Sequence, residues 1–382
     1  MAETAIEWTD HVWNVTKGCS RKSPGCGGGT PGPRKGGCYA ERMAIRLAGP
    51  GQPYEGLVES TPAGPRWTGK VVLDEELLDA PLRWRRPRRV FVNSMSDLFH
   101  ESLSFEAIDR VFATMRLAER HTFQVLTKRA DRMREYVEWA RARSLVEGLE
   151  VVPGRPITWE RAHANVWLGV SVEDQRRADE RIPHLLATPA AVRFLSCEPL
   201  LGPVDLSRWL PRARYYLARC ARCGHTASSE FFGELRNHDD ADVECPICGH
   251  LLQDEVPGIS WCIVGGESGP GARPMHPIWA RRLRDQCVAA GVPYFFKQWG
   301  AWKPCCTMTE AETEALYVPL PAGVPDDSPR RCKVASVSFT PEPMPVGGEV
   351  HTLFELGKKR AGRVLDGRTW DEFPADKGAA HA

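Results

Sequence analysis

The chain has 382 residues, of which 42% are hydrophobic and 26% are charged, and its formal net charge is +1. This composition is typical of a soluble globular protein, and the length predicts one main domain with additions. A net charge this small excludes a global attraction to nucleic acid, so any such binding must come from local patches.

No apolar run approaches the roughly 18 residues that a membrane span requires, and residues 1–10 lack the apolar region of a signal peptide. We therefore expect a cytoplasmic protein without membrane contact. The 13 cysteines of such a chain favour metal binding or thiol chemistry over a disulfide scaffold.

The first motif is a glycine-rich loop that contains Cys19, Cys26 and Cys38 and leads into a helix-like stretch, residues 40–47. Such a loop has no core in which to bury sulfur, so the thiols suit a metal ion or cluster better than packing. Three thiolates leave one iron of a cluster open, whereas a closed structural zinc site needs four ligands. A zinc site completed by His11 is the alternative, and the spacing alone does not decide between them.

A basic stretch, Arg83–Arg89, precedes the second predicted strand. Its five guanidinium groups and the indole of Trp84 are able to clamp phosphates and to stack on a base. Basic runs are also common in solvated loops. The stretch is therefore a candidate contact for DNA or RNA.

From residue 90 onward, short apolar runs alternate with stretches of helical period. The runs are Val90–Val92, Phe123–Leu126, Val166–Val170, Val192–Leu195, Trp261–Val264 and Tyr294–Phe296. The intervening periodicity predicts a helix over residues 105–115 with Ser104 as its N-cap, and another that includes Trp279, Leu283 and Cys287. With the strand before the cysteine loop, about seven parallel strands form a full or partial (β/α) barrel of the α/β class. A doubly wound open sheet is the alternative.

Each of the six runs ends in polar residues that include a carboxylate, a lysine or an arginine. Because the carboxyl ends of parallel strands open on one face, these residues predict a shared site, although polar residues also begin many ordinary loops. Lys297 lies in an otherwise apolar strand and would be costly to bury unpaired. Its expected partner is Glu198 or Glu267, in either a structural or a catalytic ion pair.

Residues 211–256 interrupt this alternation and contain two thiol knuckles, each followed by glycine. Their cysteines are Cys220, Cys223, Cys245 and Cys248. Two such knuckles predict a tetrahedral zinc site in an inserted zinc ribbon that depends on its metal to fold. A second iron–sulfur cluster is the minor alternative. Nucleic-acid binding, docking of a partner protein and stabilisation are equally open as its role.

Residues 18–44 read Gly-Cys-Ser, then Ser-Pro-Gly-Cys, then Cys-Tyr-Ala-Glu-Arg-Met-Ala, and Ile-Glu-Trp-Thr-Asp precedes them at 6–10. This pattern resembles the phage-associated three-cysteine-motif family, which is itself similar to radical-SAM enzymes such as spore photoproduct lyase. The resemblance covers most of residues 5–300 and returns at 355–374. The cysteines are spaced more widely than in the radical-SAM pattern.

The expected domains follow from the resemblance and from the zinc knuckles. They are a radical-SAM-like barrel core at 1–210 and 257–300, the zinc ribbon at 211–256, and a partly loop-like C-terminal extension at 301–382. Within the extension, residues 365–368 predict a tight turn, and the basic residues 358–363 are candidates for a phosphate-facing surface.

The resemblance implies a [4Fe–4S] cluster on the three cysteines that binds S-adenosylmethionine (SAM) at its open iron and cleaves it reductively, using an electron donor. The substrate would be a nucleic-acid base or lesion that is modified or repaired. The residues implied to contact SAM are Gly37 and Tyr39 for the adenine, Ser94 or Asp97 for the ammonium, Ser171 and Glu173 for the ribose, and Gly265 and Gly266 as a glycine wall. The candidate catalytic residues are Glu198, Glu267 and Lys297.

A second hypothesis belongs to a different class: a non-catalytic protein that its metals stabilise and that binds nucleic acid or a partner protein. The wide cysteine spacing favours this second hypothesis. The polar strand ends and the open coordination position favour the enzyme, which we take as the working hypothesis.

Overall fold

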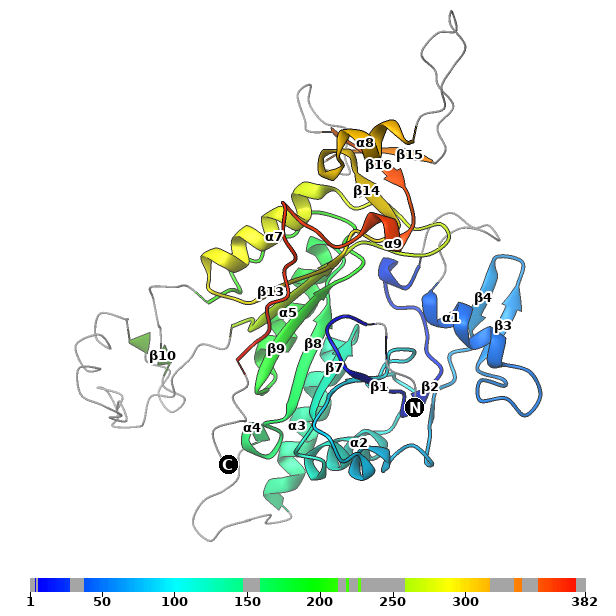
Figure 1. Ribbon diagram of the computed structural model, residues 1–382. Coiled ribbons are helices and arrows are strands. Elements are labelled where there is room, and N and C mark those ends of the chain that lie inside the picture. Colours follow the sequence, from blue (N-terminus) through cyan, green and yellow to red (C-terminus); the bar gives the residue numbers. More distant parts are fainter. Residues whose placement is uncertain are drawn as a thin grey trace, which may run out of the picture.

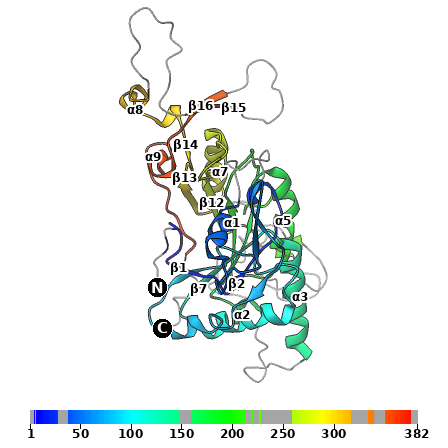
Figure 2. The same cartoon turned by 90° about the vertical axis from the view of Figure 1, so that its right-hand side faces the viewer.

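The computed structural model describes residues 4, 6–27, 38–146, 159–211, 218–219, 226–227, 258–316, 333–338 and 350–375. A seven-stranded sheet in the order β1-β6-β7-β8-β9-β12-β13 forms its centre. The strands are β1 (His11–Trp13), β6 (Arg89–Val92), β7 (Thr122–Thr127), β8 (Val166–Ser171), β9 (Val192–Cys197), β12 (Trp261–Gly265) and β13 (Tyr294–Gln298). All neighbouring pairs are parallel. The sheet curls into a half-barrel (Figures 1 and 2), which confirms the partial barrel; the strand order does not reverse as in a doubly wound sheet.

Helices cover the outer side of this sheet (Figure 2). They are α2 (Phe105–Leu117), α3 (Ala130–Val146), α4 (Trp159–Ala162), α5 (Gln175–Ala187) and α7 (Pro277–Ala289). The Ser104 hydroxyl accepts a hydrogen bond from the Ala107 amide at 3.2 Å, so the predicted N-cap of α2 is confirmed. The predicted apolar face of α7 is also buried, through Trp279, Leu283 and Cys287.

The inner side of the half-barrel is apolar near the amino ends of the strands. Six aromatic side chains pack together there: Trp8, Phe91, Trp167, Phe194, Trp261 and Phe295. A Cβ atom on Gly169 would lie 2.5 Å from the Phe194 ring, so only glycine allows this ring to lie over β8. Because strand residues alternate between faces, Ser171, Ser196 and Lys297 follow on the same inner side toward the carboxyl ends. The inner side therefore changes from aromatic to polar along the strands.

The C-terminal segment packs against the last strand and the aromatic cluster. The Phe296 amide donates to the Trp370 carbonyl at 2.9 Å, and the Trp261 indole donates to the Glu372 carbonyl at 2.8 Å. The Phe373 ring lies 5.1 Å from that of Trp261. Residues 362–373 therefore cover the edge of β13 and belong to the packing of the half-barrel.

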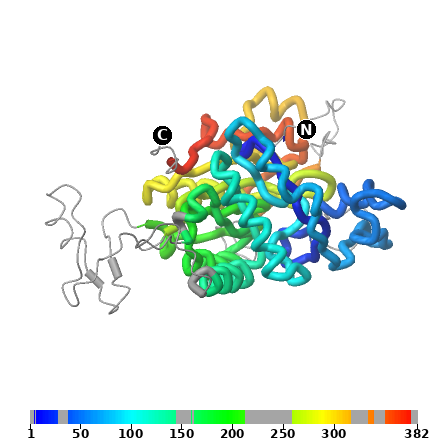
Figure 3. Tube along the Cα trace, turned by 90° about the horizontal axis from the view of Figure 1, so that it is seen from below, coloured from blue at the N-terminus to red at the C-terminus, as the bar shows by residue number. Residues whose placement is uncertain are grey.

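Smaller elements surround the sheet, and Figure 3 shows residues 39–67, coloured blue, at one side of it. These elements are α1 (Tyr39–Ala44), the β3 (Val58–Thr61)–β4 (Gly64–Trp67) hairpin, the β2 (Thr16–Lys17)–β5 (Val72–Leu73) pair, β10 (Ala218–Arg219) with β11 (Thr226–Ala227), the β14 (Trp302–Pro304)–β16 (Val350–Glu355)–β15 (Val334–Ser338) sheet, α8 (Glu310–Glu314), α9 (Lys358–Ala361), and the 3-10 turns η1 (Pro24–Cys26), η2 (Ile45–Leu47), η3 (Ala80–Arg83) and η4 (Cys305–Thr307). The predicted tight turn is confirmed by a bridge between Leu365 and Arg368.

The four cysteines of the predicted zinc ribbon lie outside the described residues. Within the described part of the chain, no helix is both long and apolar enough to cross a membrane.

Candidate metal centre

The three cysteines of the N-terminal loop lie at the carboxyl end of the sheet. Cys19 follows β2, Cys26 ends η1, and Cys38 is the N-cap of α1. Gly18 has a φ of 89°, and a Cβ atom there would lie 2.1 Å from the Lys70 carbonyl oxygen. The chain therefore needs glycine directly before Cys19 to pass the backbone that leads into β5.

The three thiols influence one another electrostatically. The pKa of Cys19 is raised to about 12, first by burial and then by the charges of Asp97, Cys26 and Cys38, while Arg129 opposes the shift. A cation among the sulfurs would relieve this repulsion, and three thiols are a donor set that iron–sulfur clusters and zinc accept. The residues present thus fit a thiolate-bound metal group.

Backbone amides contact two of the sulfurs. The Lys22 amide donates to Cys26 Sγ at 3.4 Å. The amides of Glu41 and Ala40 oppose the rise in the pKa of Cys38, which burial causes first and the Glu41 charge and Cys26 increase. Within the described residues, no group of three or more His, Cys, Asp or Glu side chains is already arranged to hold a metal ion. That the three cysteines share one cluster stays a prediction.

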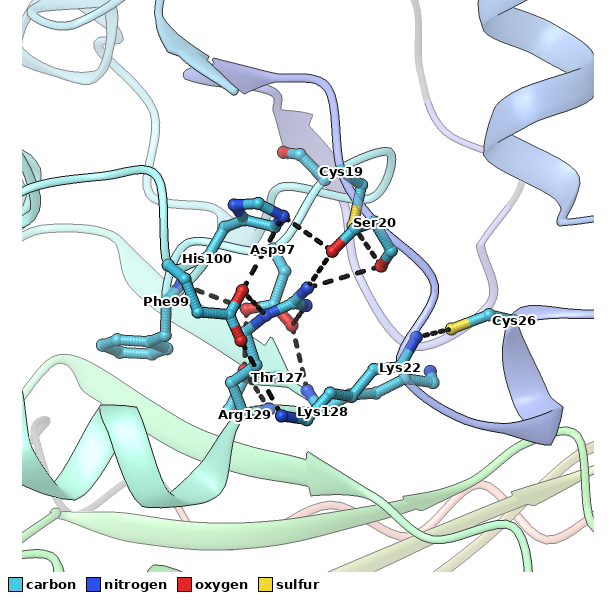
Figure 4. Close-up of polar contacts among 12 residues, drawn as sticks. Cys19, Ser20, Lys22, Cys26, Asp97, Phe99, His100, Thr127, Lys128 and Arg129 are labelled. Atoms are coloured by element: carbon cyan, nitrogen blue, oxygen red, sulfur yellow. Dashed lines mark hydrogen bonds and ion pairs between the residues drawn. The ribbon is translucent and has the colours of Figure 1, made fainter. Parts of the chain in front are cut away.

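Arg129 holds the first part of the loop. Its guanidinium group is 2% exposed and donates to Asp97 at 3.1 Å, to Glu101 at 2.8 Å and to the Ser20 hydroxyl at 2.7 Å (Figure 4). The His100 ring also makes a 2.8 Å hydrogen bond with that hydroxyl. The residue next to Cys19 is therefore attached to the loops that follow β6 and β7.

Asp97 supports this attachment. Its carboxylate accepts hydrogen bonds from the Thr127 hydroxyl at 2.7 Å and from the Phe99 and Lys128 amides at 3.1 Å, besides the one from Arg129. Four donors occupy the acceptor positions of a carboxylate. We therefore assign Asp97 to holding the loop, whereas its predicted contact with the ammonium of SAM would need a position that is already filled.

Ser94, the other candidate for the ammonium, donates to the Asn14 side-chain oxygen at 3.2 Å. Both residues lie directly beyond the ends of β6 and β1, on the edge that carries the cysteines.

Glu173 holds the middle of the loop. Its carboxylate is fully buried, accepts from the Ser23 hydroxyl at 2.6 Å and pairs with Arg181 at 3.0 Å. A Cβ atom on Gly25 would lie 2.2 Å from a Glu173 oxygen, so the loop backbone rests directly on this carboxylate. Glu173, predicted to approach a ribose, therefore acts as a support for the segment that ends at Cys26.

A third attachment comes from the end of β12. Arg273 forms an ion pair with Glu267 at 2.8 Å and donates to the Pro24 carbonyl at 3.0 Å. Glu267 is thus engaged with Arg273, and of the two predicted partners of Lys297 the structure selects Glu198.

The Glu198 carboxylate receives Lys297 at 2.9 Å on both of its oxygens and the Gln298 amide at 3.0 Å. The side chains of Lys297 and Glu198 are 14% and 18% exposed. A Cβ atom on Gly265 would lie 3.3 Å from Glu198. This ion pair stands on the polar part of the inner side and is the remaining candidate for acid–base chemistry.

The other predicted contacts of SAM are less supported by the geometry. A Cβ atom on Gly266 would lie 2.1 Å from the Trp299 carbonyl oxygen, so this glycine is needed for backbone packing. Tyr39 is 56% exposed on α1, and Gly37 lies outside the described residues. Ser171 accepts a hydrogen bond from the Lys128 ammonium at 3.1 Å.

The basic stretch Arg83–Arg89 lies before β6, at the opposite edge of the sheet from the cysteines. Trp84 is only 8% exposed because it packs against His11 and His121, so the expectation that it stacks on a base is wrong. His11, the alternative fourth zinc ligand, lies at this edge too and cannot reach the loop. Exposed cations of the stretch include Arg85 and Arg86.

The cations that organise the loop are Lys128, Arg129, Arg181 and Arg273. The strand-end pattern placed Lys128 and Arg129 in the shared site without a specific role, and sequence reasoning missed Arg181 and Arg273. Arg129 is buried directly before α3. Their position directly after the end of β7 is the signal that placed Lys128 and Arg129 in the shared site.

A family model described as a protein of unknown function (DUF5131) matches residues 3–374. No curated protein and no solved structure matches the chain.

Proposed function

The chain belongs to this family, DUF5131, and we propose that it is an iron–sulfur, radical-SAM-like enzyme that cleaves S-adenosylmethionine reductively. One observation carries the proposal: a loop with three thiols lies at the carboxyl edge of a parallel half-barrel and is attached to three strand ends. This is the edge at which such folds place their sites.

Cys19, Cys26 and Cys38 would hold three irons of a [4Fe–4S] cluster, which when bound supplies the electron for SAM cleavage. The chain itself holds the segment that carries Cys19 and Cys26 through Arg129, Glu173 and Arg273, so two of the three ligands are supported before metal binds. The aromatic cluster closes the amino half of the inner side and excludes water from it.

The proposed substrate is a nucleic-acid base or lesion. For the reaction, nucleic acid has to reach the edge that carries the cysteines. Helix α9 lies at this edge, because the Trp299 amide directly after β13 donates to the Gly362 carbonyl. Its exposed cations Lys359 and Arg360 are better placed for the substrate than Arg83–Arg89.

The test is anaerobic reconstitution with iron and sulfide, followed by incubation with SAM and a chemical reductant in place of the natural electron donor. We expect about four irons per chain and formation of 5′-deoxyadenosine. The Cys26→Ala variant should lose both. The matched control is Cys306→Ala, which removes an exposed thiol outside the loop and should change neither. Wild-type protein that binds iron but forms no 5′-deoxyadenosine would reject the enzyme.

A non-catalytic protein that binds nucleic acid or a partner is the second candidate, and two observations favour it. Asp97 and Glu173 serve to hold the loop, and the exposed Arg85 and Arg86 lie far from it. This candidate predicts nucleic-acid binding that is independent of iron and of SAM.

The zinc ribbon is a separate proposal, with Cys220, Cys223, Cys245 and Cys248 as ligands. Replacing Cys220 by Ser should release one zinc ion per chain and leave iron content unchanged, as measured by elemental analysis. An equal loss of iron would show that the two metal sites are not separate.

A further inference from the structure

Lys128 lies at the base of the cysteine loop without a carboxylate of its own. Its ammonium is 3.1 Å from the Ser171 hydroxyl and 3.8 Å from Glu173, and its side chain is 21% exposed. Glu173 in turn contacts Ser23 and Gly25, which belong to the short segment that ends at Cys26. The ammonium and this sulfur therefore share one small region of the site.

The carboxylates around the loop have closer cationic partners than this lysine, and Arg129 is shared by Asp97 and Glu101. Glu173 already pairs with Arg181, and both side chains are buried. The other pairs are Asp97 with Arg129, Glu198 with Lys297 and Glu267 with Arg273. Within the described residues, the structure pairs Lys128 with no carboxylate besides Glu173.

Lys128 nevertheless stays charged. Burial acts to lower its pKa, but the charges of Glu173 and Cys26 outweigh this effect and raise the pKa above its ordinary value. A partly buried ammonium that shares its only carboxylate is unfavourable unless another negative group is close. Lys128 thus keeps its positive charge at the base of the loop, next to a carboxylate that it shares with Arg181.

We propose that Lys128 is an electrostatic positioning residue that compensates the negative charge of a metal–thiolate group on the three cysteines. This inference rests on the proposed function. A doubly positive iron–sulfur core with three thiolates is a monoanion, and so is a divalent metal ion with three thiolates. One lysine matches either group, and its positive charge favours the more negative, reduced state of a cluster, which makes the cluster easier to reduce.

The test compares Lys128→Met, Lys128→Arg and the wild type after anaerobic reconstitution. Iron and sulfide are counted, and the midpoint potential of the cluster is measured by a redox titration followed by electron paramagnetic resonance. Loss of the charge should move the potential to more negative values, because reduction adds a further negative charge that is no longer offset. Lys128→Arg should restore the wild-type potential. Lys303→Met is the matched control, since Lys303 pairs with Glu312 away from the loop.

A second measurement uses Co²⁺ alone, with the sulfur-to-cobalt absorption as readout of binding to the reduced apoprotein. Lys128→Met should weaken Co²⁺ binding by about 10-fold, the usual effect of losing a group that supports metal ligands. An unchanged potential and an unchanged Co²⁺ affinity would overturn the inference, as would wild-type protein that binds neither iron nor Co²⁺. Wild-type protein that binds Co²⁺ with the expected dependence on Lys128 but assembles no cluster would reject the proposed function alone.

Discussion

Replacing Asp97 by Asn distinguishes a role in holding the loop from a role in binding SAM. The two roles predict different free energies of unfolding in protein without any ligand. If Asp97 holds the loop, the variant leaves the buried guanidinium of Arg129 without its carboxylate partner and turns an amide toward the donors of Thr127 and Lys128. Breaking a buried ion pair typically costs 3–5 kcal/mol, and we expect about 3 kcal/mol because Glu101 still faces Arg129. If Asp97 binds only the ammonium of SAM, stability should not change.

The free energy of unfolding is measured by urea denaturation of metal-free protein at pH 7, without SAM. The control is Asp79→Asn, which removes an exposed pair with Arg83 and should cost less than about 1 kcal/mol. A variant of Asp97 that is as stable as the control yet binds SAM more weakly would refute our assignment of this residue to the loop.

Two further predictions concern stability and binding. Burial lowers the pKa of His163 to about 4, so stability should be complete above pH 6.5 and decrease as the pH falls toward 4. Over this range, the wild type should lose about 3 kcal/mol more than His163→Phe in urea unfolding, and equal losses would contradict the burial of a neutral ring. Changing Lys359 and Arg360 together to Ala should reduce the salt dependence of nucleic-acid binding by about two contacts if nucleic acid reaches the cysteine edge. If instead the change of Arg85 and Arg86 to Ala reduces the salt dependence of binding by this amount, the non-catalytic candidate would be favoured.

The strands could be predicted from the sequence because they are buried on both faces. All six apolar runs became neighbouring strands, and the run before the cysteine loop became β1. Parallel strands under helices exclude water from both sides, so they have few polar residues until they end. The same reasoning predicted that polar strand ends would meet, and Lys297 does pair with Glu198.

The roles of individual site residues were harder to predict, because one carboxylate is suited both to bind a ligand and to hold a loop. Only the partners decide, and they come from distant positions: Ser23 meets Glu173 across 150 residues of chain. The place of the basic stretch was missed for a different reason. Residues before a strand lie at the opposite edge from those after it, so Arg83–Arg89 and the cysteines never share a surface.

The role of Lys128 is what the pattern could have revealed beyond its place at a strand end. The inner side of β7 continues through Gln124 and Leu126, and a period of two places residue 128 on the same side, beyond the strand end. In β8 the same period leads to Ser171 and Glu173, which contact Lys128. A residue that follows a strand and continues the alternation of its inner side points into the site. A residue that continues the alternation of the outer side points toward the helices. Nearer the amino ends of the strands, the inner side is filled with aromatic side chains. The charged group of Lys128 therefore faces the cysteine loop. For this reason we expect its charge to influence the metal group that the thiols bind.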